Sequence, residues 1–188
     1  MYIDGRCTRT CKRWNWPGHA HELTFSCYGH RDFLSITQTC QWLVDAIQAA
    51  RYTRDFALLA YVFMPDHVHL IIWPRRREYS ISTILQAIKM PASRKAMQWL
   101  REDQPQRLRA LATGQKDRRH RFWQKGGGYD RNITRVDTLI QAVEYLHQNP
   151  VRKGLVAYPS QWYYSSAAAW EGKVDGPLTI DKAGWPGF

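Results

Sequence analysis

Apolar residues recur along the chain with spacings that alternate between those of strands and those of helices. Partial alternation over residues 19–26 predicts a strand, and helical spacing over residues 35–51 predicts a helix. The nearly continuous apolar run 56–64 predicts a buried strand, which a Pro-Asp turn joins to a second strand at 67–73. The first part of the chain therefore predicts a hairpin that follows a strand and a helix.

The second part of the chain adds two helices and one interrupted strand. Ser80 can cap a helix that runs to about Leu100 and bends at Pro91. The remaining elements are a basic loop at 101–120, a strand over 121–124 and 129–133 that the run Gly126–Gly128 interrupts, and a helix that begins after Thr134 or Asp137 and ends at about 148, before Asn149 and Pro150. The glycine run can form a bulge, which we favour, or a backbone turn that contacts a phosphate.

This order of elements, β-α-β-β-α-β-α, predicts one α+β domain built on an antiparallel sheet. We expect the domain to occupy residues 19–170. Residues 1–18 predict a loosely held basic arm, and residues 171–188 a weakly ordered tail rich in Gly and Pro.

The composition is that of a folded globular protein, with 188 residues of which 44% are apolar. The long apolar run that contains 58–64 is cut by Pro65 and is too short to span a bilayer. The basic N-terminus lacks the apolar core of a signal peptide, so we expect a cytoplasmic protein.

Four cysteines, Cys7, Cys11, Cys27 and Cys40, are expected to be free thiols in that compartment. The first two could begin a zinc site, but no second Cys or His pair follows at the spacing of a zinc finger.

The charge is strongly basic and unevenly spread. The formal net charge is +11, and nine of the 27 Lys and Arg residues lie between Arg94 and Arg121, against three acids. Such a stretch can be a solvated helix face with a loop. However, Trp99, Phe122 and Trp123 around it offer the stacking surfaces that single strands use. Charge and aromatics together favour a nucleic-acid partner.

Two histidines, His67 and His69, stand two residues apart on a predicted strand. A strand places both imidazoles on one face, where they can bind a single divalent cation. Two surface histidines are the alternative interpretation of this pair.

Tyr145 and Asn149 lie four residues apart on the last predicted helix and so share one face. The amide oxygen of Asn149 could complete a metal site, with Tyr145 above it. A phenol, whose unperturbed pKa is near 10, is a poor nucleophile until a cation polarises the phosphate it attacks. Alternatively, Tyr145 belongs to the core and Asn149 caps the helix.

Three segments at these positions resemble the REP-associated tyrosine transposases, a branch of the single-tyrosine HUH transposases of the IS200-like family. The resemblance spans roughly residues 19–170 and rests on Tyr-Val-Phe-Met-Pro-Asp-His-Val-His-Leu at 61–70, Arg-Phe-Trp-Gln at 121–124, and Glu-Tyr-Leu-His-Gln-Asn-Pro-Val-Arg-Lys-Gly-Leu-Val at 144–156. The segment Gln-Trp-Tyr-Tyr-Ser-Ser at 161–166 is similar to that family as well.

The resemblance implies a ferredoxin-like antiparallel sheet with helices on one face. It implies a Mg²⁺ or Mn²⁺ ion held by His67, His69 and Asn149, and a Tyr145 that attacks a phosphodiester, leaving a 5′-phosphotyrosine link and a free 3′-hydroxyl. The implied substrate is a single-stranded DNA hairpin, and the protein would act as a monomer or a homodimer. We expect contacts with the DNA from Arg94, Lys95, Arg101, Arg118, Arg119, Arg121, Trp123, Arg131, Arg152 and Lys153.

Three other functions compete with this one. A histidine-triad hydrolase also uses alternating histidines, but the third alternate position here is Ile71. A DNA-binding protein that no longer cleaves, and a metal-dependent nuclease that activates water, both remain open. Tyr129, Tyr163 and Tyr164 are the competing nucleophiles.

Overall fold

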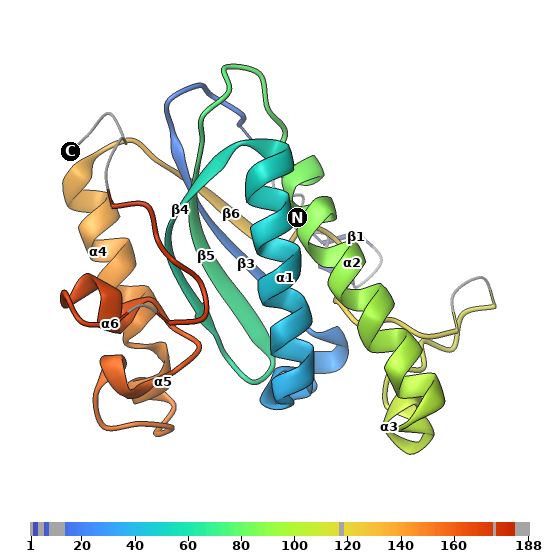
Figure 1. Cartoon of the computed structure of the whole chain (residues 1–188). Coiled ribbons are helices and arrows are strands. Elements are labelled where there is room, and N and C mark those ends of the chain that lie inside the picture. The colour runs from blue at the N-terminus through green and yellow to red at the C-terminus, as the bar shows by residue number, and fades with distance from the viewer. Residues whose placement is uncertain (1, 4–5, 8–13, 117–118, 175, 183–188) are drawn as a thin grey trace.

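The computed structural model of the chain describes residues 2–3, 6–7, 14–116, 119–174 and 176–182. Its strands and helices, drawn in Figure 1, are β1 (Tyr2–Ile3), β2 (Arg6–Cys7), β3 (Ala20–Ser26), η1 (Tyr28–His30), η2 (Phe33–Ser35), α1 (Thr37–Arg54), β4 (Phe56–Phe63), β5 (His67–Pro74), α2 (Ile81–Glu102), α3 (Pro105–Arg109), β6 (Tyr129–Ile133), α4 (Val136–His147), α5 (Asn149–Arg152), η3 (Pro159–Gln161) and α6 (Ala167–Trp170).

The main sheet has four strands in the order β4-β5-β3-β6, and every neighbouring pair is antiparallel. The chain order β3-α1-β4-β5-α2-β6 in this sheet is the ferredoxin-like arrangement. The α+β class and the antiparallel sheet predicted from the sequence are confirmed.

Helices cover both faces of the sheet, however, and not one face as we expected. Helices α1 and α2 lie side by side over one face, and α4 packs on the other face against β4 (Figure 1). The cause lies in β4, in which all eight residues are buried, so apolar side chains on both of its faces need a cover. Phe56 and Leu58 join the core under α1 and α2, whereas Ala57 and Leu59 join the core under α4.

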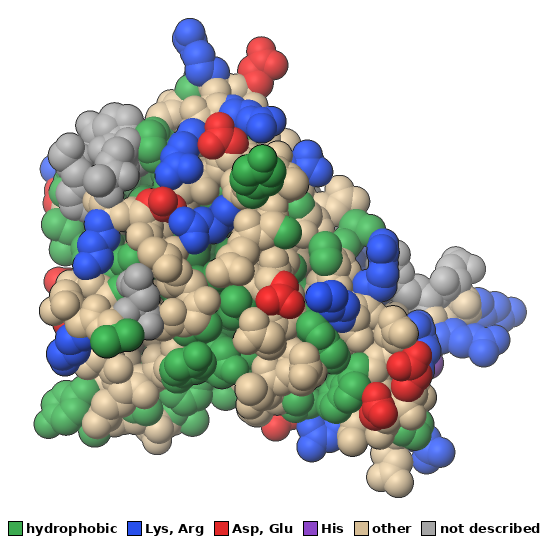
Figure 2. Space-filling model, viewed as in Figure 1, with side chains coloured by type: hydrophobic (Ala, Val, Ile, Leu, Met, Phe, Trp, Pro, Cys, Tyr) green, Lys and Arg blue, Asp and Glu red, His purple; other side chains and the backbone are tan. Residues whose placement is uncertain are grey.

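Helix α2 begins where the sequence indicates and runs without interruption across Pro91. The Ser80 hydroxyl accepts a hydrogen bond from the Thr83 amide at 3.4 Å, which caps the helix. The following stretch is less irregular than the predicted loop, because it contains α3 and a bridge between Ala112 and His120. Figure 2 shows Lys and Arg side chains on the projection that this stretch forms.

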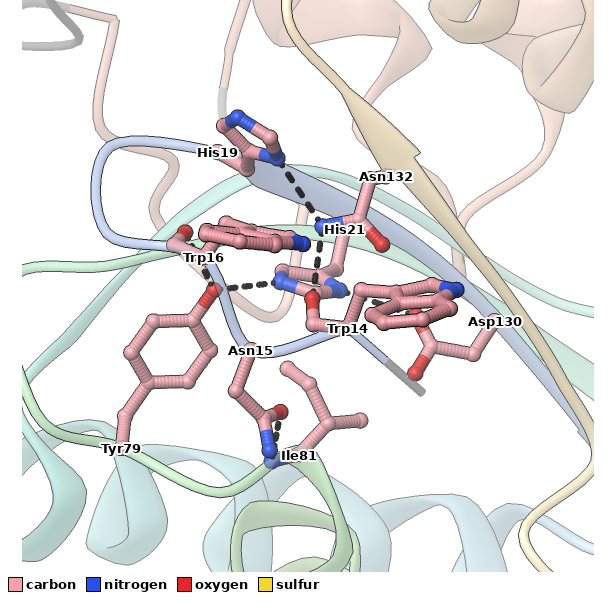
Figure 3. A network of polar contacts seen from close by, with 9 residues as sticks. All are labelled: Trp14, Asn15, Trp16, His19, His21, Tyr79, Ile81, Asp130 and Asn132. Atoms are coloured by element: carbon pink, nitrogen blue, oxygen red, sulfur yellow. Dashed lines mark hydrogen bonds and ion pairs between the residues drawn. The ribbon is translucent and has the colours of Figure 1, made fainter. Parts of the chain in front are cut away.

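Residues 14–18 of the N-terminal arm are fixed to the domain and are not loose (Figure 3). Three hydrogen bonds hold it: Asn132 Nδ2 to the Trp14 carbonyl at 2.7 Å, the Ile81 amide to Asn15 Oδ1 at 3.2 Å, and the Tyr79 hydroxyl to the Trp16 carbonyl at 2.7 Å. The arm thereby crosses the start of α2.

The predicted weak order of the C-terminal tail is wrong for residues 176–182. Leu178 is fully buried in the core under α1 and α2, and Ile180 is nearly so. The Asp181 carboxylate accepts a hydrogen bond from the Leu58 amide at 2.8 Å and one from Arg51 at 2.6 Å. The tail therefore completes the core, although its Gly and Pro content hides this in the sequence.

Among the described residues, no helix is long and apolar enough to cross a membrane. Cys27 and Cys40 are buried free thiols. The side chains of Cys7 and Cys11 lie outside the described part of the chain, as does the proposed start of a zinc site.

Candidate active site

The two histidines of β5 lie on the face of the sheet that α4 covers. Their ring centroids are 4.8 Å apart and the rings are nearly perpendicular. Val68 between them points to the other face, into the core under α1 and α2. The period-two geometry expected from the sequence therefore brings the imidazoles together, as predicted.

A neighbouring side chain holds each ring through its Nδ1 atom. His67 Nδ1 donates to the Asp66 carboxylate at 2.6 Å. Partial burial raises the pKa of Asp66, but hydrogen bonds from His67 and His30 outweigh that effect and bring it below its usual value. His69 Nδ1 is hydrogen-bonded to the Thr24 hydroxyl at 2.8 Å. Both Nε2 atoms are left for another partner, as in metal sites whose outer groups orient the imidazoles.

The Nε2 atom of His69 is buried and has no hydrogen-bond partner among the described residues. Burial, together with smaller contributions from the charges of His67 and Arg152, lowers the pKa of His69 to about 4. A neutral imidazole is the form that binds a metal, and an unpartnered buried nitrogen costs stability when nothing occupies it. The two imidazoles are therefore donors of the kind that binds a divalent cation, although no group of three or more His, Cys, Asp or Glu side chains among the described residues is placed to hold one.

Tyr145 projects from α4 into a cavity that His69 also lines. The cavity has a volume of about 480 Å³. The Tyr145 side chain is 57% exposed, so it does not belong to the core, and the alternative of a core tyrosine is excluded. Leu139, Val143 and Leu146 of α4 are buried against the sheet, so the opposite face of the helix, which carries Tyr145, points away from the core.

Arg152 stacks on the ring of Tyr145. Its guanidinium carbon lies 3.9 Å from the centre of the Tyr145 ring, and its Nη2 atom donates to the Tyr145 carbonyl at 2.7 Å. A planar guanidinium stacked on a ring restricts its orientation and places a positive charge next to the cavity.

Asn149 is not among the residues that line this cavity. Its side-chain nitrogen donates to the carbonyls of Tyr145 at 3.3 Å and Leu146 at 3.0 Å, which is the capping contact weighed above as the alternative. The structure therefore brings together His67 and His69 and places Tyr145 beside His69, while a ligand role for Asn149 stays a prediction.

Three further side chains line the cavity and were missed by the sequence analysis. Glu22 is buried and pairs with Arg131 at 2.8 Å, Thr24 holds His69, and Gln141 lies one helical turn before Tyr145. A signal was available, because Glu22 and Thr24 are the alternating polar positions of the first predicted strand.

The expected DNA contacts are dispersed. Arg131 lines the cavity beside Tyr145, and Arg94, Arg121 and Trp123 line a second one. Lys95 instead pairs with Asp45 on α1 at 3.5 Å. Arg101, Arg119 and Lys153 are exposed, and Arg118 lies outside the described residues.

The competing tyrosines differ in position. Tyr129 lines the same cavity as Tyr145 and is 50% exposed. Tyr163 and Tyr164 pack against each other, and the Tyr164 ring stacks on Phe63. Tyr129 is thus the competitor that an experiment must test.

The family model described as "Transposase IS200 like" matches residues 25–149, a span that includes the histidine pair, Tyr145 and Asn149. The chain belongs to the IS200-like transposase family. No curated protein sequence is significantly similar to it.

Two solved structures are similar to this chain. One is described as a REP-associated tyrosine transposase bound to a REP hairpin; it is 22% identical, with 94% of each chain covered and a TM-score of 0.67. That likeness confirms the fold. The other, a putative transposase from Deinococcus radiodurans R1, is 17% identical over 73% of this chain and 95% of its own, with a TM-score of 0.45.

Proposed function

We propose that this transposase is a metal-dependent nickase and strand transferase of single-stranded hairpin DNA, of the REP-associated tyrosine type, with Tyr145 as its nucleophile. The observation that supports this most directly is the shared cavity, where the exposed Tyr145 stands beside His69, a partly buried imidazole whose buried Nε2 atom has no partner among the described residues. The fold shared with a hairpin-bound transposase supports the choice of substrate.

His67 and His69 would hold a Mg²⁺ or Mn²⁺ ion through their Nε2 atoms, with Asn149 as the proposed oxygen ligand. When bound, such an ion would withdraw charge from the scissile phosphate and orient its oxygens. The side-chain nitrogen of Asn149 donates to the helix carbonyls, so its oxygen is the atom that would ligate the ion.

The chain's own groups carry the transfer. The Tyr145 oxygen attacks phosphorus and forms a P–O bond, the phenolic proton passes to solvent, and the bond from phosphorus to the 3′ oxygen breaks. The leaving oxygen takes up a proton and becomes a free 3′-hydroxyl, while the 5′ phosphate stays on the tyrosine. Arg152 fixes the ring for this attack, and its charge lies close enough to attract the phosphate.

The test is a covalent adduct between the protein and a labelled DNA hairpin with single-stranded flanks, incubated with Mn²⁺ and resolved on a denaturing gel. We expect the adduct with the unaltered protein and with Tyr129→Phe, and no adduct with Tyr145→Phe. The Tyr129 variant is the matched control, since both tyrosines line the cavity.

An adduct that persists in Tyr145→Phe and disappears in Tyr129→Phe would assign the nucleophile to Tyr129. Nicking without any adduct would indicate a nuclease that activates water. Binding of the hairpin with neither product would indicate a DNA-binding protein that does not cleave.

A further inference from the structure

The cavity beside Tyr145 contains an ion pair to which the catalytic proposal above assigns no role. Glu22 on β3 and Arg131 on β6 both line it, and the Arg131 Nη2 atom lies 2.8 Å from the Glu22 Oε2 atom. Among the described residues, Glu22 is the only Asp or Glu that lines this cavity. A carboxylate is unexpected in a cavity that is to receive a phosphate, because like charges repel. Its presence is best explained by what it does to Arg131.

Glu22 is nearly buried, whereas Arg131 is partly open to solvent. Their side chains are 9% and 44% exposed, respectively. A buried carboxylate is costly unless a cation compensates it, and Arg131 is that cation here. A guanidinium carries five N–H donors, and no other acid among the described residues pairs with Arg131. Donors therefore remain for a ligand in the cavity.

The register of the sheet directs this guanidinium toward the histidine pair. Arg131 lies directly opposite Glu22 on β3, which separates the edge strand β6 from β5. An arginine on β6 that pairs with a β3 side chain therefore leans inward across the sheet. The neighbouring row on the same face, two residues along each strand, consists of Tyr129, Thr24 and His69.

The spacing between His69 and Arg131 allows one phosphate to be contacted from both sides. Neighbouring strands are about 4.8 Å apart and two residues along a strand span about 7 Å, so the Cβ atoms of these two residues are about 12 Å apart. Both side chains rise from the same face of the sheet into the cavity. Tyr145 projects into that cavity from α4, so a phosphate between the imidazole and the guanidinium also lies within its reach.

The charge that develops during the transfer is one that an arginine can stabilise. When the Tyr145 oxygen attacks, negative charge builds up on the non-bridging oxygens of the phosphate. A guanidinium stays protonated, so it stabilises this charge without giving up a proton, and its planar fork can contact two oxygens. The gain is largest when the donor is oriented beforehand. Glu22 supplies that orientation from the buried side of Arg131.

We propose that Arg131 is a catalytic residue that donates hydrogen bonds to a non-bridging oxygen of the phosphate attacked by Tyr145, and that Glu22 is the positioning residue that holds its guanidinium in place. The proposal rests on the proposed function for the identity of the reaction. It assigns opposite effects to the Glu22 carboxylate, which weakens DNA binding because it repels phosphate and speeds the transfer because it fixes Arg131.

The first test separates rate from affinity. The rate of adduct formation is measured at saturating hairpin with Mn²⁺, and the affinity by fluorescence anisotropy in a Tyr145→Phe background. Glu22→Gln should slow the adduct about tenfold and bind the hairpin at least as tightly as the unaltered carboxylate does. Arg131→Gln should slow it about 100-fold. The double variant should be no slower than Arg131→Gln, since Glu22 acts through Arg131.

The matched controls, Asp55→Asn and Arg76→Gln, remove the same charges from an ion pair outside the cavity and should keep the rate. Calorimetric titration should give Glu22→Gln the Mn²⁺ affinity of the unaltered protein, and a weaker affinity would make Glu22 a metal ligand. An unchanged rate in Glu22→Gln would mean that it does not position Arg131. A rate and a hairpin affinity that fall together would mean a general loss of structure. Each of these results would overturn the proposal.

The second test does not depend on cleavage. A neutral methylphosphonate replaces the phosphates of the single-stranded flank one at a time, and binding is measured without metal in the Tyr145→Phe background. At one position the replacement should weaken binding about threefold or more, and it should have no effect once Arg131→Gln is added. The absence of such a position, or a position other than the cleaved one, would refute the contact. An absent adduct would instead refute the proposed function, and the scan would still show whether Arg131 contacts a phosphate.

Discussion

Gly126 and Gly128, on either side of Gly127, both have a positive φ angle but differ in what surrounds them. Substituting each by alanine therefore tests the effect of those surroundings. A Cβ atom added at Gly126 would meet nothing within 4 Å. At Gly128 it would lie 1.8 Å from the Thr24 carbonyl oxygen, whereas real Cβ contacts essentially never fall below 3.0 Å. Either the loop or β3 has to move by the difference, 1.2 Å.

Gly126→Ala should cost only the strain of a side chain at positive φ, about 1–2 kcal/mol. Gly128→Ala adds the displacement of a strand that is hydrogen-bonded on both sides, by β5 and by β6. We expect a total loss of about 3 kcal/mol or more, within the usual range for severe single substitutions. Because Thr24 also holds His69, this variant should bind Mn²⁺ more weakly even when it is folded.

Urea unfolding followed by tryptophan fluorescence gives the free energy of unfolding of both variants, and calorimetric titration gives their affinity for Mn²⁺. Equal destabilisation by the two substitutions would refute the close contact of Gly128 with β3. Normal Mn²⁺ affinity in a destabilised Gly128→Ala protein would mean that the conformation of this loop does not affect the metal site.

Three further predictions concern single side chains. Thr24→Val removes the group that orients His69 and should weaken Mn²⁺ binding 10- to 100-fold by titration, with little change in unfolding free energy; unchanged affinity would mean that Thr24 is not an orienting group. Arg152→Gln should slow adduct formation two- to fivefold, the equivalent of about 0.5–1 kcal/mol for an exposed cation on a ring, and Arg152→Lys should restore part of it; an equal rate in both variants would exclude the stacking role. Burial lowers the pKa of His147 to about 4, below its unfolded value near 6.5, so the unfolded chain binds a proton first and stability should fall as the pH drops from 6.5 toward 4; without metal, His147→Gln should flatten that profile.

The sequence predicts the sheet and the histidine pair well, because both follow from local periodicity. Strand alternation puts His67 and His69 on one face whatever the tertiary structure is. The continuous apolar run of β4 also indicates that both faces of the sheet are covered, because a strand exposed on one face would alternate apolar and polar residues.

Long-range placement could not be predicted in the same way. Nothing near Arg152 in the sequence indicates that its guanidinium stacks on Tyr145, because the chain has to turn through α5 first. The alternation of Glu22 and Thr24 was visible, but their meeting with His69 depends on the register between β3 and β5. The role of Leu178 in the core was hidden for a similar reason, since the residues around it predict a turn-rich tail.

The C-terminal segments bear on whether two copies of this protein can join their sheets through β4, the edge strand opposite β6. An open edge presents unpaired amides and carbonyls that another chain can extend. Here the Phe63 amide donates to the Tyr164 carbonyl at 2.9 Å, and backbone and side-chain atoms of Asp181 bind both the amide and the carbonyl of Leu58 at 2.8 Å. Because this edge is already occupied, we expect a protein that does not dimerise by extending its sheet at β4.

Asp181→Ala should open the edge near Leu58, lower the unfolding free energy by about 1–3 kcal/mol for the amide left unpaired, and increase association at high concentration in sedimentation velocity. Asp181→Asn keeps an oxygen for the Leu58 amide and serves as the control, and a dimer of the unaltered protein that Asp181→Ala leaves unchanged would show that copies meet elsewhere.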